Sequence, residues 1–187
     1  MAAGIVGYNL KHGQIAARGA SPTYVDLPYV MTVDATIAQN SDKMPADGAK
    51  VVTAYSAPEG SGSLTMGMFH LTTQAMMAGG TASQSGTAGT AISRLEIKGS
   101  AQPPALIGSF WIPNIDGNLA AAGLRMTLPN CKFSVPSGTF DQETWASVSA
   151  DLSFDPDAND TLIIYEELAT APVFTLGVMP TNLVAPA

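Results

Sequence analysis

The chain has 187 residues, of which 46% are hydrophobic, 7% aromatic and 12% charged, and its formal net charge is −7. This length suits one domain, the apolar content excludes a disordered chain, and no apolar run reaches the ~18 residues that a membrane-spanning helix needs. Stable wrapping of nucleic acid requires clustered Lys and Arg, so eight basic residues against fifteen acidic ones argue against a nucleic-acid-binding protein. The charged fraction is about half of the ~25% of an average soluble domain, which suits a protein mostly covered by its neighbours.

Residues 1–28 show no sustained periodicity and are predicted to form an N-terminal arm. They lack the basic region and long apolar run of a secretory signal, so we expect the protein to be made and kept in a cytoplasm. The single cysteine, Cys131, lies in a predicted strand that also bears Phe133 and Val135, and it is expected in the core.

The segment from 29 to 80 predicts a strand, a long loop, two further strands and a helix. Along residues 29–38 mainly polar side chains alternate with apolar ones, as in a half-buried strand that exposes one face to solvent. Residues 39–48 are dense in turn formers and longer than an ordinary hairpin loop. Strands resume at 51–55 and 63–68, and a short helix over 70–78 is ended by two glycines.

The rest of the chain predicts more short strands. Residues 79–90 are small and polar and are expected to form a mobile loop. Strands are predicted at 92–98, 104–112, 123–128, 131–135, 144–154 and 161–166. Strands at this spacing indicate a mainly-β sandwich or barrel with one helix, placed at residues 29–166. Residues 167–187 are expected to form a C-terminal arm or the last strand of the sheet.

The order strand, extended loop, strand, strand, helix, with Asp47-Gly48 ending the loop, resembles the major tail tube proteins of long-tailed, siphovirus-like bacteriophages. Segments 104–112, 131–136 and 139–154 look like later strands of that family, and the resemblance covers residues 24 to 165. It implies a β-sandwich or barrel tail-tube fold with one short helix, an extended loop and terminal arms.

The resemblance also implies a function, which is structural. Such proteins form hexameric rings that stack into the hollow tail tube through which DNA passes during ejection. The implied partners are further copies of the chain and the tape-measure, tail terminator and tail tip proteins, and the implied location is the virion tail, assembled in the host cytoplasm.

The long loop is the expected contact between stacked rings, because stacking needs a heterologous contact between the top and bottom of each subunit. Its residues are Asn40, Ser41, Asp42, Lys43, Met44, Pro45, Ala46, Asp47 and Gly48.

Three predicted strands each have one face of small or acidic side chains. In a tube such faces suit the lumen, since hydroxyls hydrate the wall and carboxylates repel DNA phosphates. Plain solvent exposure is the alternative explanation. The residues concerned are Thr32, Asp34, Thr36, Ser63, Thr65, Ser147, Ser149, Asp151 and Ser153.

Enzyme motifs are not apparent in the sequence. His12 and His70 are the only histidines, and neither stands in a nucleophile-elbow or triad context. No glycine pattern indicates nucleotide binding, and two histidines with one distant cysteine are poor grounds for a transition-metal site. We therefore expect neither enzymatic activity nor a cofactor.

One acidic segment partly matches a calcium loop. Asp155, Asp157, Asn159 and Glu166 occupy positions 1, 3, 5 and 12 of the spacing, but position 6 is Asp160 instead of glycine and the flanks are predicted strands. A tight turn is the simpler interpretation.

Two alternative functions stay open. Within phage structural proteins, a capsid decoration or head-tail connector protein could share a small β-rich fold and low charge. Outside them, a calcium-stabilised β-sandwich for adhesion or carbohydrate binding would usually present an aromatic platform, whereas Trp111 and Trp145 both lie in predicted strands and are expected to pack.

Overall fold

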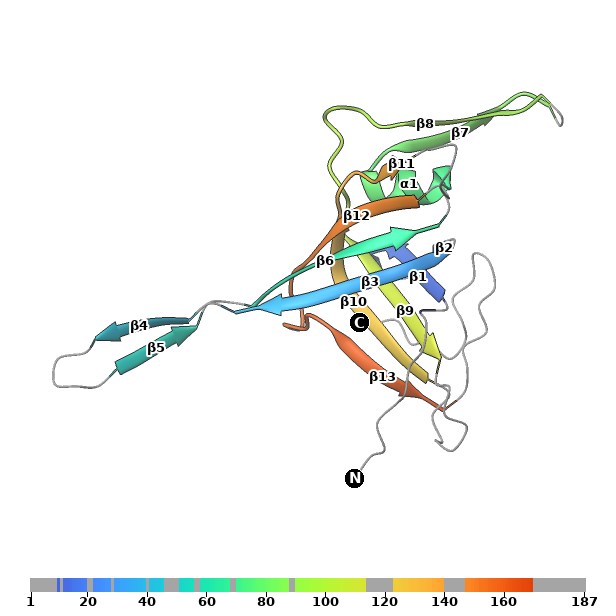
Figure 1. Ribbon diagram of the computed structural model, residues 1–187. Coiled ribbons are helices and arrows are strands. Elements are labelled where there is room, and N and C mark those ends of the chain that lie inside the picture. Colours follow the sequence, from blue (N-terminus) through green and yellow to red (C-terminus); the bar gives the residue numbers. More distant parts are fainter. Residues whose placement is uncertain are drawn as a thin grey trace.

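The computed structural model describes residues 10, 12–19, 22–27, 29–39, 41–45, 51–55, 58–67, 70–87, 90–113, 123–139 and 147–169, without the side chains of 41–45, 51–55 and 139. The expected mainly-β fold with one short helix is confirmed (Figure 1). The elements are β1 (His12–Ala17), β2 (Tyr24–Leu27), β3 (Val30–Ala38), β4 (Ser41–Pro45), β5 (Val51–Tyr55), β6 (Glu59–Met66), α1 (Leu71–Ala78), β7 (Thr81–Ser85), β8 (Ile92–Glu96), β9 (Leu106–Pro113), β10 (Gly123–Phe133), β11 (Ser137–Thr139), β12 (Ser147–Phe154) and β13 (Ile164–Leu168).

Nine of these strands form one antiparallel sheet in the order β2-β1-β9-β10-β12-β6-β3, with β11 beside β12 and β13 beside β10. Strand β10 joins the two halves of this sheet, since its first part pairs with β13 and its last three residues pair with β12. Its register against β9 shifts between Leu128 and Cys131, and such a bulge bends a strand. The two strands predicted at 123–128 and 131–135 are therefore a single bulged strand.

Residues 12–27 do not form the arm that was expected of residues 1–28. Strand β1 pairs with β2 and, over its whole length, with β9. The Ile15 side chain is fully buried, so β1 is an interior strand of the sheet. At the other end, β13 continues to Leu168, past the expected limit at 166, and residues from 170 onward lie outside the described part.

The main core lies on the inner face of the curled sheet, and a smaller buried cluster of Ala16, Tyr24 and Ile107 lies on its other face. The register places Ile15, Gly108 and Leu128 side by side across β1, β9 and β10, and the same face continues through β12 to β6. Cys131 lies in this core, as predicted, and burial raises the pKa of its thiol to about 12, so the nucleophilic thiolate is suppressed. The buried core residues are Ile15, Leu27, Leu64, Met66, Met77, Leu106, Phe110, Met126, Leu128, Cys131, Phe133, Val148, Ala150, Leu152 and Phe154.

Helix α1 begins after His70 and ends where predicted. Gly79 adopts the left-handed conformation at φ 69°, and the Gly80 N–H donates to the Ala75 carbonyl at 2.8 Å, which completes a glycine C-cap. Met77 points into the core. No helix in the described part of the chain is both long and apolar enough to cross a bilayer.

Two hairpins lie outside the main sheet, and each contains a strand where the sequence predicted a loop. Residues 41–45 of the expected loop 39–48 form β4, which pairs with β5. Residues 81–85 of the expected mobile loop 79–90 form β7, which pairs with β8. Figure 1 shows β4–β5 projecting far beyond the ends of β3 and β6, and β7–β8 lying over α1. In each hairpin the pairing with a later strand stabilises a segment that has little hydrophobic signal of its own.

Candidate functional site: a polar sheet face between two open strand edges

Strands β3, β6, β12 and β11 share an exposed face of small polar side chains, here called the polar face. Residues directly opposite one another on antiparallel strands lie on the same side of a sheet. Thr32, Thr65, Ser149 and Ser137 form one such row across the four strands. A second row contains Asp34, Ser63 and Asp151, and a third contains Thr36, Ser61, Ser153 and Lys132.

The nine side chains selected from sequence therefore lie on one face. Ser147, the ninth, begins β12 opposite Thr139. The Ser63 hydroxyl donates to the Asp34 carboxylate at 3.3 Å, and the Asp151 N–H donates to the Ser134 hydroxyl at 2.8 Å. Asp34 and Asp151 are exposed, so both carboxylates are hydrated.

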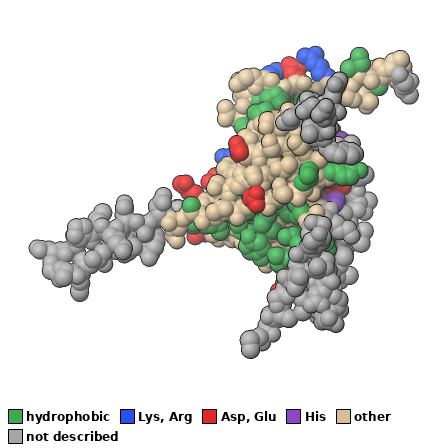
Figure 2. All heavy atoms as spheres, in the orientation of Figure 1, with side chains coloured by type: hydrophobic (Ala, Val, Ile, Leu, Met, Phe, Trp, Pro, Cys, Tyr) green, Lys and Arg blue, Asp and Glu red, His purple; other side chains and the backbone are tan. Residues whose placement is uncertain are grey.

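Sequence reasoning missed three members of the polar face. Ser61 and Ser137 lie outside the strand limits that were predicted, and Lys132 was overlooked although it alternates with the buried Cys131 and Phe133. Lys132 is exposed and is the one cation in the three rows. Figure 2 shows tan and scattered red atoms over this region of the surface.

The regular alternation predicted for β3 is broken at its start. The register shifts between Val30 and Thr32, so Val30 pairs with the buried Met66 and packs against the core, whereas Thr32 joins the polar face. A bulge at Met31 explains why two residues of the same parity lie on opposite faces.

The polar face ends at two strand edges that lack a partner among the described residues. Strand β3 pairs with β6 alone and β11 pairs with β12 alone. Strand β3 is nine residues long and has neither Lys nor Pro, the residues that usually protect an edge against further pairing. Because β3, β6, β12 and β11 are successively antiparallel, the two open edges run in opposite directions.

The residues expected to contact a neighbouring ring are only partly described. Ser41, Asp42, Lys43, Met44 and Pro45 form strand β4. Asn40, Ala46, Asp47 and Gly48 lie outside the described residues, so the expected contact stays a prediction.

The acidic segment is a turn. The Asp157 carboxylate accepts the N–H groups of Asn159 and Thr161, each at 2.9 Å, and Asp160 adopts a left-handed φ of 60° that Asp tolerates. Glu166 lies in β13 and forms an ion pair with Arg125 of β10. No cluster of three or more His, Cys, Asp or Glu suited to a metal occurs within the described residues. The geometry therefore does not assemble the calcium candidate.

We expect Glu166→Ala to destabilise the fold by about 2–3 kcal/mol, because the Arg125 side chain, 5% exposed, would lose its charge partner. The double variant Arg125→Met/Glu166→Ala should recover most of that loss, since no buried charge remains. Urea denaturation checks both values, and millimolar calcium should not shift the wild-type midpoint. A calcium-dependent midpoint that disappears in Glu166→Ala would restore the calcium interpretation.

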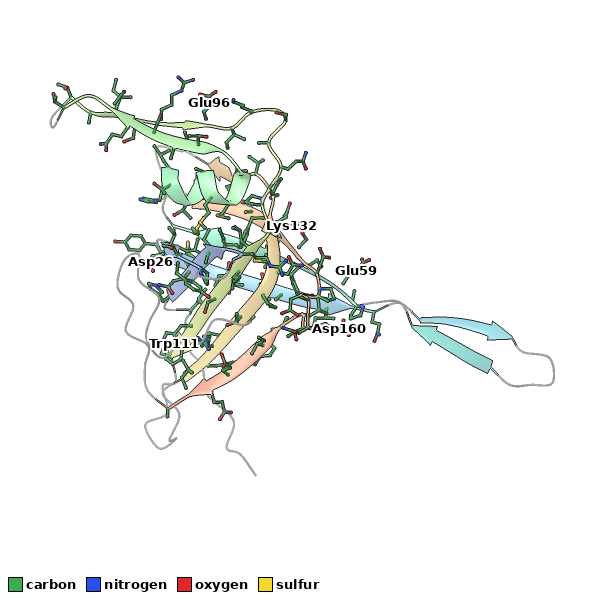
Figure 3. The ribbon with its side chains drawn as sticks, turned by 180° about the vertical axis from the view of Figure 1, so that it is seen from behind. Asp26, Glu59, Glu96, Trp111, Lys132 and Asp160 are labelled. Carbon is green, nitrogen blue, oxygen red and sulfur yellow. The ribbon has the colours of Figure 1, made fainter. Side chains whose placement is uncertain are left out.

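The two histidines meet in one structural network that their sequence positions did not indicate. His12 Nε2 lies 2.9 Å from an Asp26 carboxylate oxygen, which also accepts from Gln14 Nε2 at 2.6 Å. His70 Nδ1 lies 3.1 Å from the Thr73 hydroxyl, and that hydroxyl donates to the Asp26 carbonyl at 3.5 Å. These contacts connect β1, β2 and α1, and Figure 3 shows Asp26 beneath the helix. Trp111 is 4% exposed and packs as expected, while Trp145 lies outside the described residues.

No family model and no curated protein matches this chain. Among solved structures, a chain of the sheath-tube complex of an extracellular contractile injection system, PVC, in its extended state has a TM-score of 0.51 at 11% identity, covering 83% of this chain and 88% of that one. A chain of the tube-terminating cap of the anti-feeding prophage has a TM-score of 0.51 at 10% identity, covering 87% of this chain and 93% of that one. At sequence identities this low, the comparisons show similarity of fold alone. The chain thus shares the fold of one chain from a sheath-tube complex and one from a tube-terminating cap, which supports the expected tail-tube fold at that general level.

Proposed function

We propose that this protein is the repeating subunit of a hollow tail tube and acts by assembly instead of catalysis. The observation that carries this proposal is the polar face bounded by two open edges of opposite direction. An isolated subunit with a long exposed edge is prone to uncontrolled pairing, whereas closure of several subunits into one barrel removes both open edges of the polar face.

The strand order permits such closure. Each subunit would contribute β11, β12, β6 and β3, which is an even number of alternating strands. Rotation about a barrel axis preserves strand direction, so β3 of one copy would meet β11 of the next in antiparallel orientation. That pairing continues the ladder without a change of type.

The two faces of this four-strand unit determine which side lines the tube. The face opposite the polar face belongs to the core, where it packs against the second half of the sheet with Phe110 and Met126. That layer must lie outside the barrel, because a lumen filled by it would be closed. The polar face then lines the lumen, where Asp34 and Asp151 repel phosphates and hydroxyls hold water.

The finer features of the proposal come from the resemblance to long-tailed phage proteins. They are rings of six, stacking through the β4–β5 hairpin with residues 40–48 at the contact, and DNA passage during ejection. Tape-measure, terminator and tip proteins are the proposed partners, and the virion tail is the proposed location. Support at the general level comes from the two structural neighbours, one in a sheath-tube complex and one in a tube cap.

The test is electron microscopy of the purified protein over a range of concentrations, beside a variant without the β4–β5 hairpin. Ala38 lies opposite Glu59 in the β3–β6 ladder, so a two-residue Asn-Gly turn can replace residues 39–58 without altering the register. We expect the wild type to form tubes with a central channel and the variant to form folded subunits or rings that do not elongate.

Three outcomes would contradict parts of this proposal. Tubes of normal length from the hairpin variant would remove the stacking role of β4–β5. Wild-type protein that forms single rings but never tubes, even with tail tips as seeds, would indicate a cap or connector. Wild-type protein that stays monomeric at every concentration would exclude the tube function.

A further inference from the structure

Large apolar side chains that remain exposed occur mainly near strand edges in the described part of the chain. Three of them lie in β3 or directly before it, and Val135, 51% exposed, lies two residues before β11. Exposed strand edges bordered by apolar side chains are typical of surfaces that another chain covers. The complete set is Tyr29, Met31, Ile37, Ile92, Ile97, Val135 and Tyr165.

Tyr29 has an unusual backbone conformation for its residue type. Its φ is 49°, in the left-handed region, and its side chain is 75% exposed. The Gly67 N–H donates to the Tyr29 carbonyl at 2.8 Å and so holds the turn in place. Apart from glycines, only Asp160 among the described residues shares a positive φ, and Asp adopts it readily. Residues held in such sparsely populated backbone conformations cluster at functional sites.

Met31 extends the same surface. Its side chain is 60% exposed, and the bulge in β3 directs it away from the regular alternation of the strand. A Cβ placed on Gly67 would lie 3.5 Å from the Tyr29 Cβ and 3.7 Å from the Met31 sulfur. The Tyr29 and Met31 side chains therefore flank Gly67 and form one exposed apolar surface, here called the Tyr29–Met31 patch.

We propose that the Tyr29–Met31 patch anchors a second copy of this chain, seated with its β11 edge against β3. The proposal rests on the proposed tube function and names the side chains that select the neighbour. A second copy is the fitting occupant because the patch is continuous with the open β3 edge, and the chain itself supplies an open edge of opposite direction at β11. Val135, beside that second edge, is a further exposed apolar side chain; because it precedes β11 and the pairing is antiparallel, it would lie toward the Ile37 end of β3.

An anchor role makes a prediction that a role in folding does not. Glycine adopts a left-handed φ without strain, so Tyr29→Gly should leave the melting temperature of the isolated subunit equal or higher. Loss of an aromatic anchor should nevertheless raise the lowest protein concentration at which assemblies form, by about tenfold or more. Met31→Ser should act in the same direction without touching the strained position.

The experiment measures the melting temperature below the assembly threshold and light scattering over a concentration series. The matched control is Tyr165→Gly, which removes an exposed tyrosine from β13 at the other half of the sheet and should leave the threshold unchanged. The proposal is overturned if Tyr29→Gly and Met31→Ser both assemble at the wild-type concentration. A lower melting temperature for Tyr29→Gly would also overturn it, by making Tyr29 a folding residue. Wild-type protein that never assembles would instead defeat the tube function itself.

Discussion

Gly62→Ala should lose about 3 kcal/mol or more of folding free energy and give little soluble protein. Gly62 lies in β6 between β3 and β12, and an added Cβ would lie 1.9 Å from the Asp34 carbonyl oxygen. The contact is with backbone, so relief requires β3 to move away from β6. Overpacking of this kind typically costs ~1–3 kcal/mol and more where the backbone must shift. Urea denaturation followed by circular dichroism measures the loss.

Gly67→Ala provides the matched control for this change. Gly67 directly follows β6, and the nearest atom to an added Cβ, Tyr29 Cβ, is at 3.5 Å, an ordinary van der Waals distance. Its unfolding midpoint should stay close to the wild type. Equal midpoints for Gly62→Ala, Gly67→Ala and the wild type would show that β3 and β6 do not approach each other as closely as the structure has them.

The double variant Asp34→Lys/Asp151→Lys should assemble normally but retain DNA in the proposed lumen. Each substitution replaces a charge of −1 with a charge of +1, so the net charge of the polar face rises by four units per subunit. The two new lysines then lie on the same face as Lys132. Both aspartates are exposed, so folding should change little. Rings of lysines bind DNA phosphates and thereby slow the passage of DNA. This binding weakens strongly as the salt concentration rises.

The measurement is co-sedimentation of assembled tubes with DNA at low and high salt, together with the rate of DNA ejection from particles that carry the variant. Asp155→Lys/Glu167→Lys makes the same change of net charge at exposed positions outside the three rows of the polar face and should bind less DNA in the tube. Equal DNA retention by both double variants, or none by either, would argue against the luminal position of the polar face.

The polar face shows how far a periodic pattern can predict structure. Alternation identified the exposed side chains of β3, β6 and β12 separately, because a strand directs successive residues to opposite faces whatever it pairs with. The join between the three strands depends on register, and nothing local in the sequence specifies that Asp34, Ser63 and Asp151 form one row. The bulge at Met31 interrupts the pattern for the same reason, since it exists only relative to β6.

The sequence by itself determined the fold class, the helix with its glycine cap, the buried cysteine and the composition of the polar face, because each follows from local conformation or from the period of one strand. The tertiary structure decided what depends on partners distant in the chain. It placed β1 inside the sheet, converted two polar loops into hairpins, paired Glu166 with Arg125 and left one edge of β3 without a partner among the described residues. Hydrogen bonds between strands and the burial of charge are properties of pairs, so they emerge only when the chain has folded.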